Sequence, residues 1–154
     1  MMNIINLKHE PQHLPLLARW HQSEWGYLNP EETIEKRIER MQANLNADFI
    51  PGTWVALTDQ LAGSAAIVVQ DMDTHQQFSP WLASVYVCPA QRQQGIGSAL
   101  VTHVMRAAAE QGIQTLYLFT PDQAPFYQKL GWTTIEQPVY RGHQVSVMKV
   151  ALNT

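Results

Sequence analysis

The sequence predicts a mixed α/β fold in which a sheet of about six to seven strands is flanked by helices. Seven short β-prone runs alternate with amphipathic helical patterns along the chain. Two of these runs, residues 82–87 and 115–119, are joined through a helical segment, which predicts a parallel pair. The 154 residues are 45% hydrophobic and 15% charged, which fits one domain spanning residues 1–154.

The N-terminal third begins with a predicted strand at residues 3–7 and a predicted helix at residues 13–25. The helix is indicated by Leu14, Leu17 and Trp20, which recur at helical spacing. Further along, Pro51-Gly52 ends the helical region and a hairpin follows, because two β-prone runs are separated by a three-residue link. These runs are residues 54–57 and 61–69.

A second helix is predicted to start at Asn29. Asn29 suits the cap, Pro30 suits the first helical position, and Glu32 stands where a capping box places an acid. Apolar residues then recur on one stripe that the helix would bury: Ile34, Ile38, Met41 and Leu45. The charged residues on its other faces are predicted to form solvated surface: Glu35, Lys36, Arg37, Glu39 and Arg40.

The C-terminal half predicts a polar loop at residues 71–80, followed by the strand at residues 82–87. An ordinary exposed loop is expected, and the alternative is a loop that lines a substrate site. A helical pattern then runs from the glycines near position 95 to Gln111, with Gly112 as its stop. Its outward positions are Thr102, Arg106 and Glu110. A short helix and two closing strands complete the prediction: residues 124–130, 132–137 and 145–152.

Composition excludes several partners and compartments. The net charge is −3 and no Lys/Arg-rich block occurs, so we expect no nucleic-acid partner. No apolar run approaches the ~18 residues of a membrane helix, and the first residues lack a signal-peptide pattern. Cys88 is the single cysteine, so no intrachain disulfide can form. We therefore expect a cytoplasmic protein with no membrane partner.

A glycine turn between a predicted strand and a predicted helix is the first candidate for binding. Gly95 and Gly97 stand at the helix start, where backbone N–H groups and the helix dipole can hold a phosphate. A dinucleotide-binding fingerprint would need a third glycine or alanine where Leu100 stands, and no Gly-Lys-Ser/Thr occurs. The pattern that does match is R-x-x-G-x-G, from Arg92 to Gly97.

This segment resembles the pyrophosphate-binding motif of the GCN5-related N-acetyltransferase (GNAT) superfamily. A second segment from Phe126 to Trp132, FYQKLGW, resembles the F-Y-x-x-L-G-F segment of the same family. The resemblance covers residues from about 81 to the C-terminus. It implies a GNAT-like fold and an N-acetyltransferase that uses acetyl-coenzyme A (acetyl-CoA) as co-substrate and no metal.

The resemblance also implies where the donor binds. The backbone amides of the glycine turn would hold the pyrophosphate, since glycine lets the backbone approach closely. The end of the preceding strand would pair its backbone with the pantetheine arm. The cofactor-binding residues expected on this basis are Val85, Tyr86, Val87, Arg92, Gln93, Gln94, Gly95, Ile96, Gly97, Ser98 and Phe126.

Tyr127 is the catalytic residue that the resemblance implies. A tyrosine at this position donates a proton to the departing thiolate in many family members, and the alternative is a tyrosine that only packs. The family often has an asparagine where this chain has Thr120, so the chain departs from the family pattern here, and Thr120 and Asp122 are the alternatives for a contact with the pantetheine arm. The resemblance implies direct transfer to an amine in a ternary complex.

The general base and the acceptor are not identified by the sequence. The predicted central strand, residues 82–87, contains no acid, so a base must come from elsewhere or from a water chain. Five residues are possible bases, although a surface position explains each of them: Glu24, Asp71, Asp73, His75 and His143. Core or loop packing equally explains the aromatic and polar residues that could line an acceptor pocket: Trp25, Tyr27, Trp81, Ser84 and Tyr140.

Two further chemistries are disfavoured. Cys88 follows the predicted strand, but a small residue at a tight strand exit explains it better than a covalent acetyl carrier. The six histidines lack ligand spacing, so no metal site is expected. The expected function is acetyl transfer to a small-molecule amine or a peptide N-terminus, by a monomer or homodimer. The alternative is a non-catalytic acyl-CoA-binding sensor or scaffold.

Overall fold

A mixed seven-stranded sheet forms the centre of the molecule, which confirms the predicted fold class. The computed structural model describes residues 2–152. The strand order is β1-β2-β3-β4-β5-β9-β6, and β7 and β8 form a separate small hairpin. The strands are β1 (Asn3–Asn6), β2 (Gly52–Leu57), β3 (Leu61–Val68), β4 (Trp81–Val87), β5 (Thr115–Thr120), β6 (Thr133–Glu136), β7 (Val139–Tyr140), β8 (His143–Gln144) and β9 (Ser146–Ala151).

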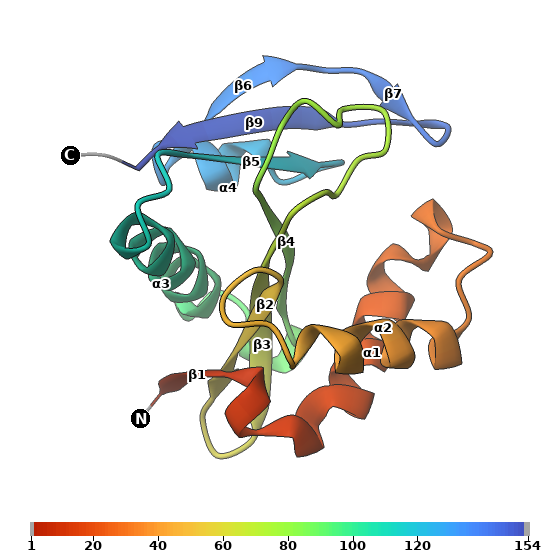
Figure 1. Cartoon of the computed structure of the whole chain (residues 1–154), viewed down its shortest axis with the longest axis vertical. Helices are drawn as coiled ribbons and strands as arrows, with labels where there is room; N and C mark the ends of the chain where they lie inside the picture. Colours follow the sequence, from red (N-terminus) through yellow and green to blue (C-terminus); the bar gives the residue numbers. More distant parts are fainter. Residues whose placement is uncertain (1, 153–154) are drawn as a thin grey trace.

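Helices cover both faces of the β2–β4 half of the sheet. Figure 1 shows α3 on one side of these strands and the pair α1 and α2 on the other. The α-helices are α1 (Leu14–Trp25), α2 (Ile34–Asn44), α3 (Ile96–Glu110) and α4 (Ala124–Gln128). Within residues 2–152, four 3-10 turns lie in the connections between these elements: η1 (Leu7–His9), η2 (Pro11–His13), η3 (Gly26–Leu28) and η4 (Pro89–Gln91).

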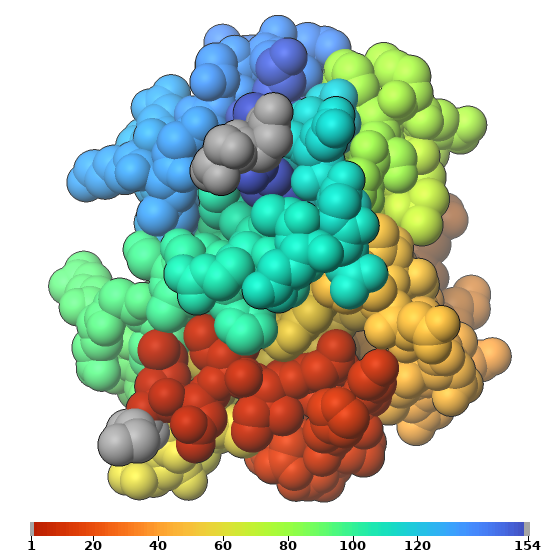
Figure 2. Space-filling view, turned by 60° about the vertical axis from the view of Figure 1, so that its left-hand side comes forward, coloured from red at the N-terminus to blue at the C-terminus, as the bar shows by residue number. Residues whose placement is uncertain are grey.

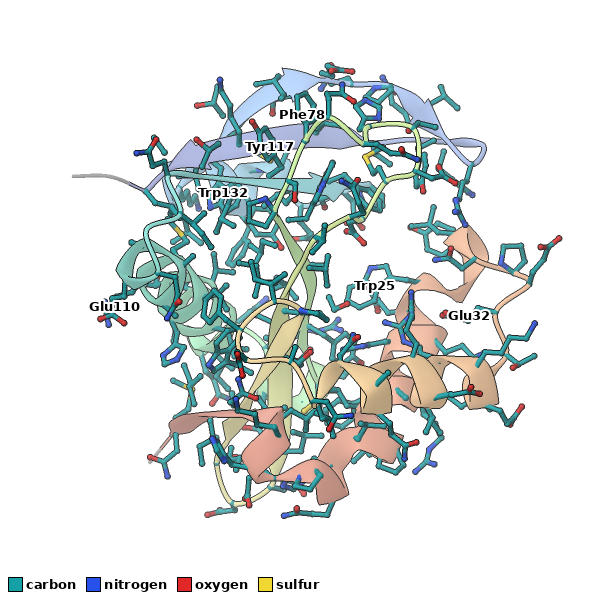
Figure 3. All side chains as sticks on the ribbon, in the orientation of Figure 1. Trp25, Glu32, Phe78, Glu110, Tyr117 and Trp132 are labelled. Carbon is teal, nitrogen blue, oxygen red and sulfur yellow. The ribbon has the colours of Figure 1, made fainter. Side chains whose placement is uncertain are left out.

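Helix α3 follows the sequence pattern closely. Its apolar row, Ile96, Leu100, Val104 and Ala108, is buried in the main core. Glu110 points away from the sheet, as predicted (Figure 3). In Figure 2 the exposed face of α3 lies between the C-terminal strands and the N-terminal segment. None of the helices in residues 2–152 has the length and apolar character needed to cross a membrane.

The predicted start of the second helix is wrong. Helix α2 begins at Ile34, and its cap is Thr33, whose hydroxyl accepts the Lys36 N–H at 3.1 Å. Asn29 instead accepts a hydrogen bond from Arg141, and Glu32 forms ion pairs with two arginines of α2. Asn29 and Glu32 are thus engaged with other partners, and the helix is capped four residues later by Thr33.

Smaller boundary differences occur elsewhere, and they reflect the fraying typical of element ends. The last predicted residue of the first strand, Leu7, begins a 3-10 turn, and α4 ends at Gln128 rather than at residue 130. The predicted hairpin is present, with the Thr58 N–H donating to the Gln60 carbonyl at 3.0 Å. The predicted parallel pairing of β4 and β5 is confirmed.

Candidate functional site

Strands β4 and β5 separate almost as soon as they meet. Within residues 2–152 their register pairs only Trp81 with Tyr117. Further along β4, two residues, Ser84 and Val85, lie opposite the single Ala65 of β3, which forms a bulge. Ser84 adopts a left-handed conformation there, with φ of 53°. The bulge bends β4 away from β5, and Figure 1 shows the two halves of the sheet running in different directions.

A cavity of about 1150 Å³ occupies the space that this divergence opens. Its walls come from β4, the start of α3, the segment from β5 to α4, α1 and α2, and the β3–β4 loop. All but one of the residues expected to contact the donor line it; Gln94 does not. The lining members are Val85, Tyr86, Val87, Arg92, Gln93, Gly95, Ile96, Gly97, Ser98, Phe126 and Tyr127.

The glycine turn forms one end of this cavity. Gly95 precedes α3 with φ of 82°, a conformation that strongly favours glycine. A Cβ at Gly97 would lie 3.4 Å from Phe126 Cζ and 3.6 Å from Val87 Cγ2, so this position faces the cavity-lining side chains. The first N–H groups of a helix have no partner within it, and the helix dipole is positive there. This end of the cavity suits an anion.

Arg92 braces the end of β4. Its Nε donates to the Val87 carbonyl at 2.8 Å, and its guanidinium lies 5.6 Å from the Tyr86 ring centroid. The Cys88 N–H donates to the Ala62 carbonyl on the β3 side. Because successive residues of a strand direct their N–H groups to opposite edges, the Val87 N–H points toward the gap beside β5. The carbonyl of Val87 still has a second lone pair.

Tyr127 lies on α4, the short helix that follows β5. Its ring is buried against Phe126 and Trp132, with centroid separations of 4.9 and 6.0 Å. Burial, reinforced by the Asp122 charge, raises the pKa of the Tyr127 phenol well above 10. The hydroxyl is therefore protonated at neutral pH and is able to donate a hydrogen bond.

Thr120 serves the turn that precedes α4. Its hydroxyl accepts the N–H groups of Asp122 and Gln123, at 3.4 and 3.0 Å. Thr120 also lines the cavity, so the structure brings it to the site while its oxygen already holds the turn.

A buried chain of hydrogen bonds connects α2 to the bulge in β4. Arg37 donates from Nη2 to His21 Nδ1 at 3.0 Å, and from Nη1 to Glu32 at 3.1 Å. His21 Nε2 lies 2.9 Å from the Ser64 hydroxyl, which donates to the Ser84 carbonyl at 2.8 Å. Because arginine can only donate, His21 carries its hydrogen on Nε2, and every proton in the chain is thereby placed.

The prediction that Arg37 is solvated surface is wrong. Its side chain is 9% exposed, and both it and His21 line the cavity. Burial, together with the charges of Arg37 and Arg40, lowers the pKa of His21 well below 6.5, so this imidazole is neutral. His21 was not among the predicted site residues, although it shares an apolar helical stripe with Leu14 and Leu17.

The β3–β4 loop is not the ordinary exposed loop that the sequence predicted. Met72 is fully buried in a cluster with Trp81 and Tyr140, which draws the loop onto the core. The loop contributes Asp71 and Asp73 to the cavity wall. Asp73 pairs with Arg141 at 3.3 Å, and Arg141 also donates to the Leu28 carbonyl at 3.2 Å. These contacts tie the loop and the β7–β8 turn to η3.

Asp71 differs from its neighbours. It is partly buried, and within residues 2–152 no hydrogen bond or ion pair reaches its carboxylate. Burial raises its pKa to about 6, against the opposing influence of Arg40, Arg37 and Arg141. A partly buried carboxylate without a bonded partner is unfavourable unless a ligand supplies one.

The other possible bases are less suitably placed. His75 Nε2 is 3.0 Å from Glu136 and its Nδ1 is 2.8 Å from Thr74, outside the cavity lining. The ring of His143 packs on Tyr27, and neither residue lines the cavity. Glu24 does line it, with its carboxylate 4.0 Å from Arg92 Nη2.

Some of the residues expected to line an acceptor pocket reach the cavity, and others do not. Ser84, Tyr140 and Trp25 line the cavity, and Figure 3 shows Trp25 extending from α1 toward β4. Trp81 is instead a core residue with no exposed surface. Cys88 is buried outside the cavity lining. Among the described residues, no group of three or more His, Cys, Asp or Glu side chains is arranged to hold a metal ion.

Comparisons with known proteins agree with this geometry. The family model described as an acetyltransferase (GNAT) domain matches residues 51–134. The structure is similar to that of an aminoglycoside 6'-N-acetyltransferase complexed with coenzyme A, with TM-score 0.79, 19% identity and coverage of 99% and 98% of the two chains. It is also similar to YncA, a putative acetyltransferase from Salmonella typhimurium with its cofactor acetyl-CoA, with TM-score 0.74, 15% identity and coverage of 100% and 95%.

A third similar structure is an aminoglycoside 6'-acetyltransferase type Ii, with TM-score 0.75, 21% identity and coverage of 100% of this chain and 98% of the other. These identities are low, so the structural likenesses establish the fold. A search of curated protein sequences found no match. The family model covers more than half of the sequence, and the chain therefore belongs to the GNAT acetyltransferase family.

Proposed function

We propose that this protein transfers the acetyl group of acetyl-CoA directly to a primary amine in a ternary complex. The observation that carries the proposal is a single cavity that contains the N-terminus of α3, the open edge of β4 and the buried Tyr127. Anion-binding backbone, strand edge and acid are thus present in one continuous space. Similar structures contain coenzyme A or acetyl-CoA, which supports the choice of donor.

The donor side of the proposal rests on backbone groups. The turn from Gln93 to Ser98 offers N–H groups and the positive end of the α3 dipole for a pyrophosphate. Val85 and Val87 offer the free edge of β4 to the amide groups of a pantetheine arm, much as a sheet edge binds a peptide. The bulge at Ser84 keeps that edge clear of β5.

The acid in the proposal is Tyr127. Acetyl-CoA supplies a reactive thioester, whose sulfur becomes anionic as the acetyl group leaves. The phenol of Tyr127 stays protonated because of its burial, and it donates a hydrogen bond that strengthens as that charge develops. Such a bond contributes to the transition state more than to the ground state, which is what lowers a barrier.

The acceptor class follows from the other wall of the cavity. This wall combines Trp25 and Tyr140 with charged groups of both signs, and it suits a small polar amine or an unfolded peptide N-terminus. Two of the similar structures are named as aminoglycoside acetyltransferases, so aminoglycosides belong among the acceptors to be tested.

The test is a coenzyme A release assay over a panel of amines: aminoglycosides, polyamines, free amino acids and short peptides. We expect the wild type to acetylate at least one class. Tyr127→Phe should lower kcat by about 10²–10⁴-fold while the affinity for coenzyme A is kept. Tyr117→Phe is the matched control, because Tyr117 stacks on Phe78 at 4.5 Å outside the cavity lining (Figure 3).

Two outcomes would contradict the proposal. Coenzyme A binding without turnover of any amine would favour the non-catalytic sensor or scaffold. Unchanged kcat in Tyr127→Phe would remove the acid role and leave this tyrosine as a packing residue.

A further inference from the structure

Among the acids in the described cavity wall, Asp71 is the one that is partly buried, and no hydrogen bond or ion pair within residues 2–152 reaches its carboxylate. It follows β3 in the chain and lies on the loop that Met72 fixes to the core. Of the other cavity-lining acids, Asp73 pairs with Arg141 and Glu24 lies 4.0 Å from Arg92. Asp122 accompanies Tyr127 on the donor side. Asp71 is therefore the partly buried acid that can offer its carboxylate to an incoming group, whereas the Asp122 side chain is exposed.

The arginines near Asp71 are bonded to other residues and leave its carboxylate free to bind an acceptor. Arg37 and Arg40 of α2 both pair with Glu32, and Arg37 also holds His21. Arg141, from the β7–β8 turn, is held by Asp73 and the η3 backbone. These charges are near enough to lower the pKa of Asp71, yet burial outweighs them and the pKa is raised to about 6. The group thus ionises near the pH at which an enzyme works.

The position of Asp71 complements that of the donor groups. Val68 pairs with Trp81 at the start of β4, so the loop after β3 lies at the opposite end of β4 from the glycine turn. An acceptor that enters between this loop and α2 would approach the middle of β4 from the side away from the pyrophosphate end. The strand itself, Trp81–Val87, contains no acid that could act there.

We infer that Asp71 binds the ammonium group of the acceptor and takes its proton. This inference rests on the proposed function. The ammonium gives one proton to the carboxylate and becomes a free amine, whose nitrogen lone pair forms a bond to the thioester carbon. The carbon–sulfur bond breaks, the sulfur leaves with the bonding pair, and it receives a proton as the amine nitrogen loses its second one. Asp71 then releases its proton to water.

The test uses Asp71→Asn, which keeps the shape of the side chain and removes the charge. With the best acceptor from the amine panel, kcat should fall by about 100-fold or more, while the affinity for coenzyme A stays that of the wild type. The wild-type kcat/KM should rise with pH through a limb centred near pH 6, and this limb should be absent in the variant. Asp59→Asn, in the β2–β3 turn, removes the same charge away from the cavity and should change neither quantity.

Asp71→Glu keeps the carboxylate and guards against misinterpreting a folding defect. It should retain a rising limb at a shifted pH, even if Asp71→Asn proves unstable. A wild-type kcat and an unaltered limb in Asp71→Asn would overturn the inference, and so would a higher KM at unchanged kcat. If the wild type acetylates an amine and Asp71→Asn does not, both the acetyl-transfer proposal and the role of Asp71 are supported. If the wild type acetylates no amine, both are overturned.

Discussion

Replacing Ser64 with alanine tests whether the buried hydrogen-bond chain holds the bulge in β4. The Ser64 hydroxyl has no exposed surface and lies between two polar groups, His21 Nε2 at 2.9 Å and the Ser84 carbonyl at 2.8 Å. Alanine removes both bonds at once and fills nearly the same volume. The cost is therefore that of two polar groups left without partners, and not that of a cavity.

The magnitude follows from that count. A buried donor or acceptor deprived of its partner costs about 1–3 kcal/mol, and the carbonyl is only partly buried. We expect Ser64→Ala to lower the free energy of unfolding by about 2–4 kcal/mol, measured by urea denaturation. Because the carbonyl belongs to the bulge, the affinity for coenzyme A should fall as well.

Ser79→Ala is the matched control, since its exposed hydroxyl donates a single bond to the Val69 carbonyl at 2.7 Å. It should change the free energy of unfolding by no more than about 0.5 kcal/mol, as is usual for surface substitutions. An equally small change in Ser64→Ala would refute the reasoning, because it would show that neither His21 nor the bulge depends on this hydroxyl.

Two further predictions concern the turn and the titrating groups. Gly95→Ala should lower the free energy of unfolding by about 1–2 kcal/mol, measured by urea denaturation, because alanine is strained at a φ of 82°. No atom lies within 4 Å of the added Cβ, so a steric clash adds nothing to this cost. Gly26→Ala is the control and should cost nothing, because φ is −59° there. The free energy of unfolding should fall below pH 6.5, since the unfolded chain then protonates His21 and the folded chain does not. Asp71 opposes this between about pH 4 and 6, because its raised pKa makes the folded state bind more protons there. Asp71→Asn should therefore steepen the loss of unfolding free energy at acid pH, measured by urea denaturation, and add about 1–3 kcal/mol at pH 7. A variant profile identical to that of the wild type would contradict the Asp71 shift. A variant whose unfolding free energy does not fall as the pH drops below 6.5 would contradict the His21 shift.

The fold could be predicted because its signals are local. Alternation and helical spacing placed most strands and helices to within about two residues, the usual uncertainty of element ends, whereas the start of α2 was predicted four residues too early. The parallel pairing of β4 with β5 followed from the helix between them. The glycine turn could also be predicted, because a residue with φ of 82°, as at Gly95, is usually a glycine, and glycine is visible in the sequence.

The polar chain was not predicted because its members are far apart in sequence: His21 and Ser64 are 43 positions apart. A signal for two of them was nevertheless present. Arg37 stands three residues after Ile34 and four before Met41, on the apolar stripe of α2. His21 stands four residues after Leu17 on the stripe of α1. A polar residue on a buried stripe requires a partner, and each of these residues is the other's partner.

Asp71 is a different case, since nothing local marks it. Its burial depends on Met72, which packs with Trp81 and Tyr140, and those contacts exist only in the folded chain. The sequence could place Asp71 in a polar loop, but it could not say that the loop turns inward.

The polar chain from Arg37 to Ser84 cannot act as a proton path, because Arg37 at its end is already protonated. A proton passed from the cavity to Ser64 and His21 would have to leave through a guanidinium that is already protonated and cannot accept it. The neighbouring arginine charges also lower the pKa of His21, which makes it a poor proton acceptor. The chain can therefore fix the Ser84 carbonyl but cannot conduct a proton. Under the proposed function, an ammonium near the centre of β4 would therefore give its proton to Asp71, which lines the same cavity.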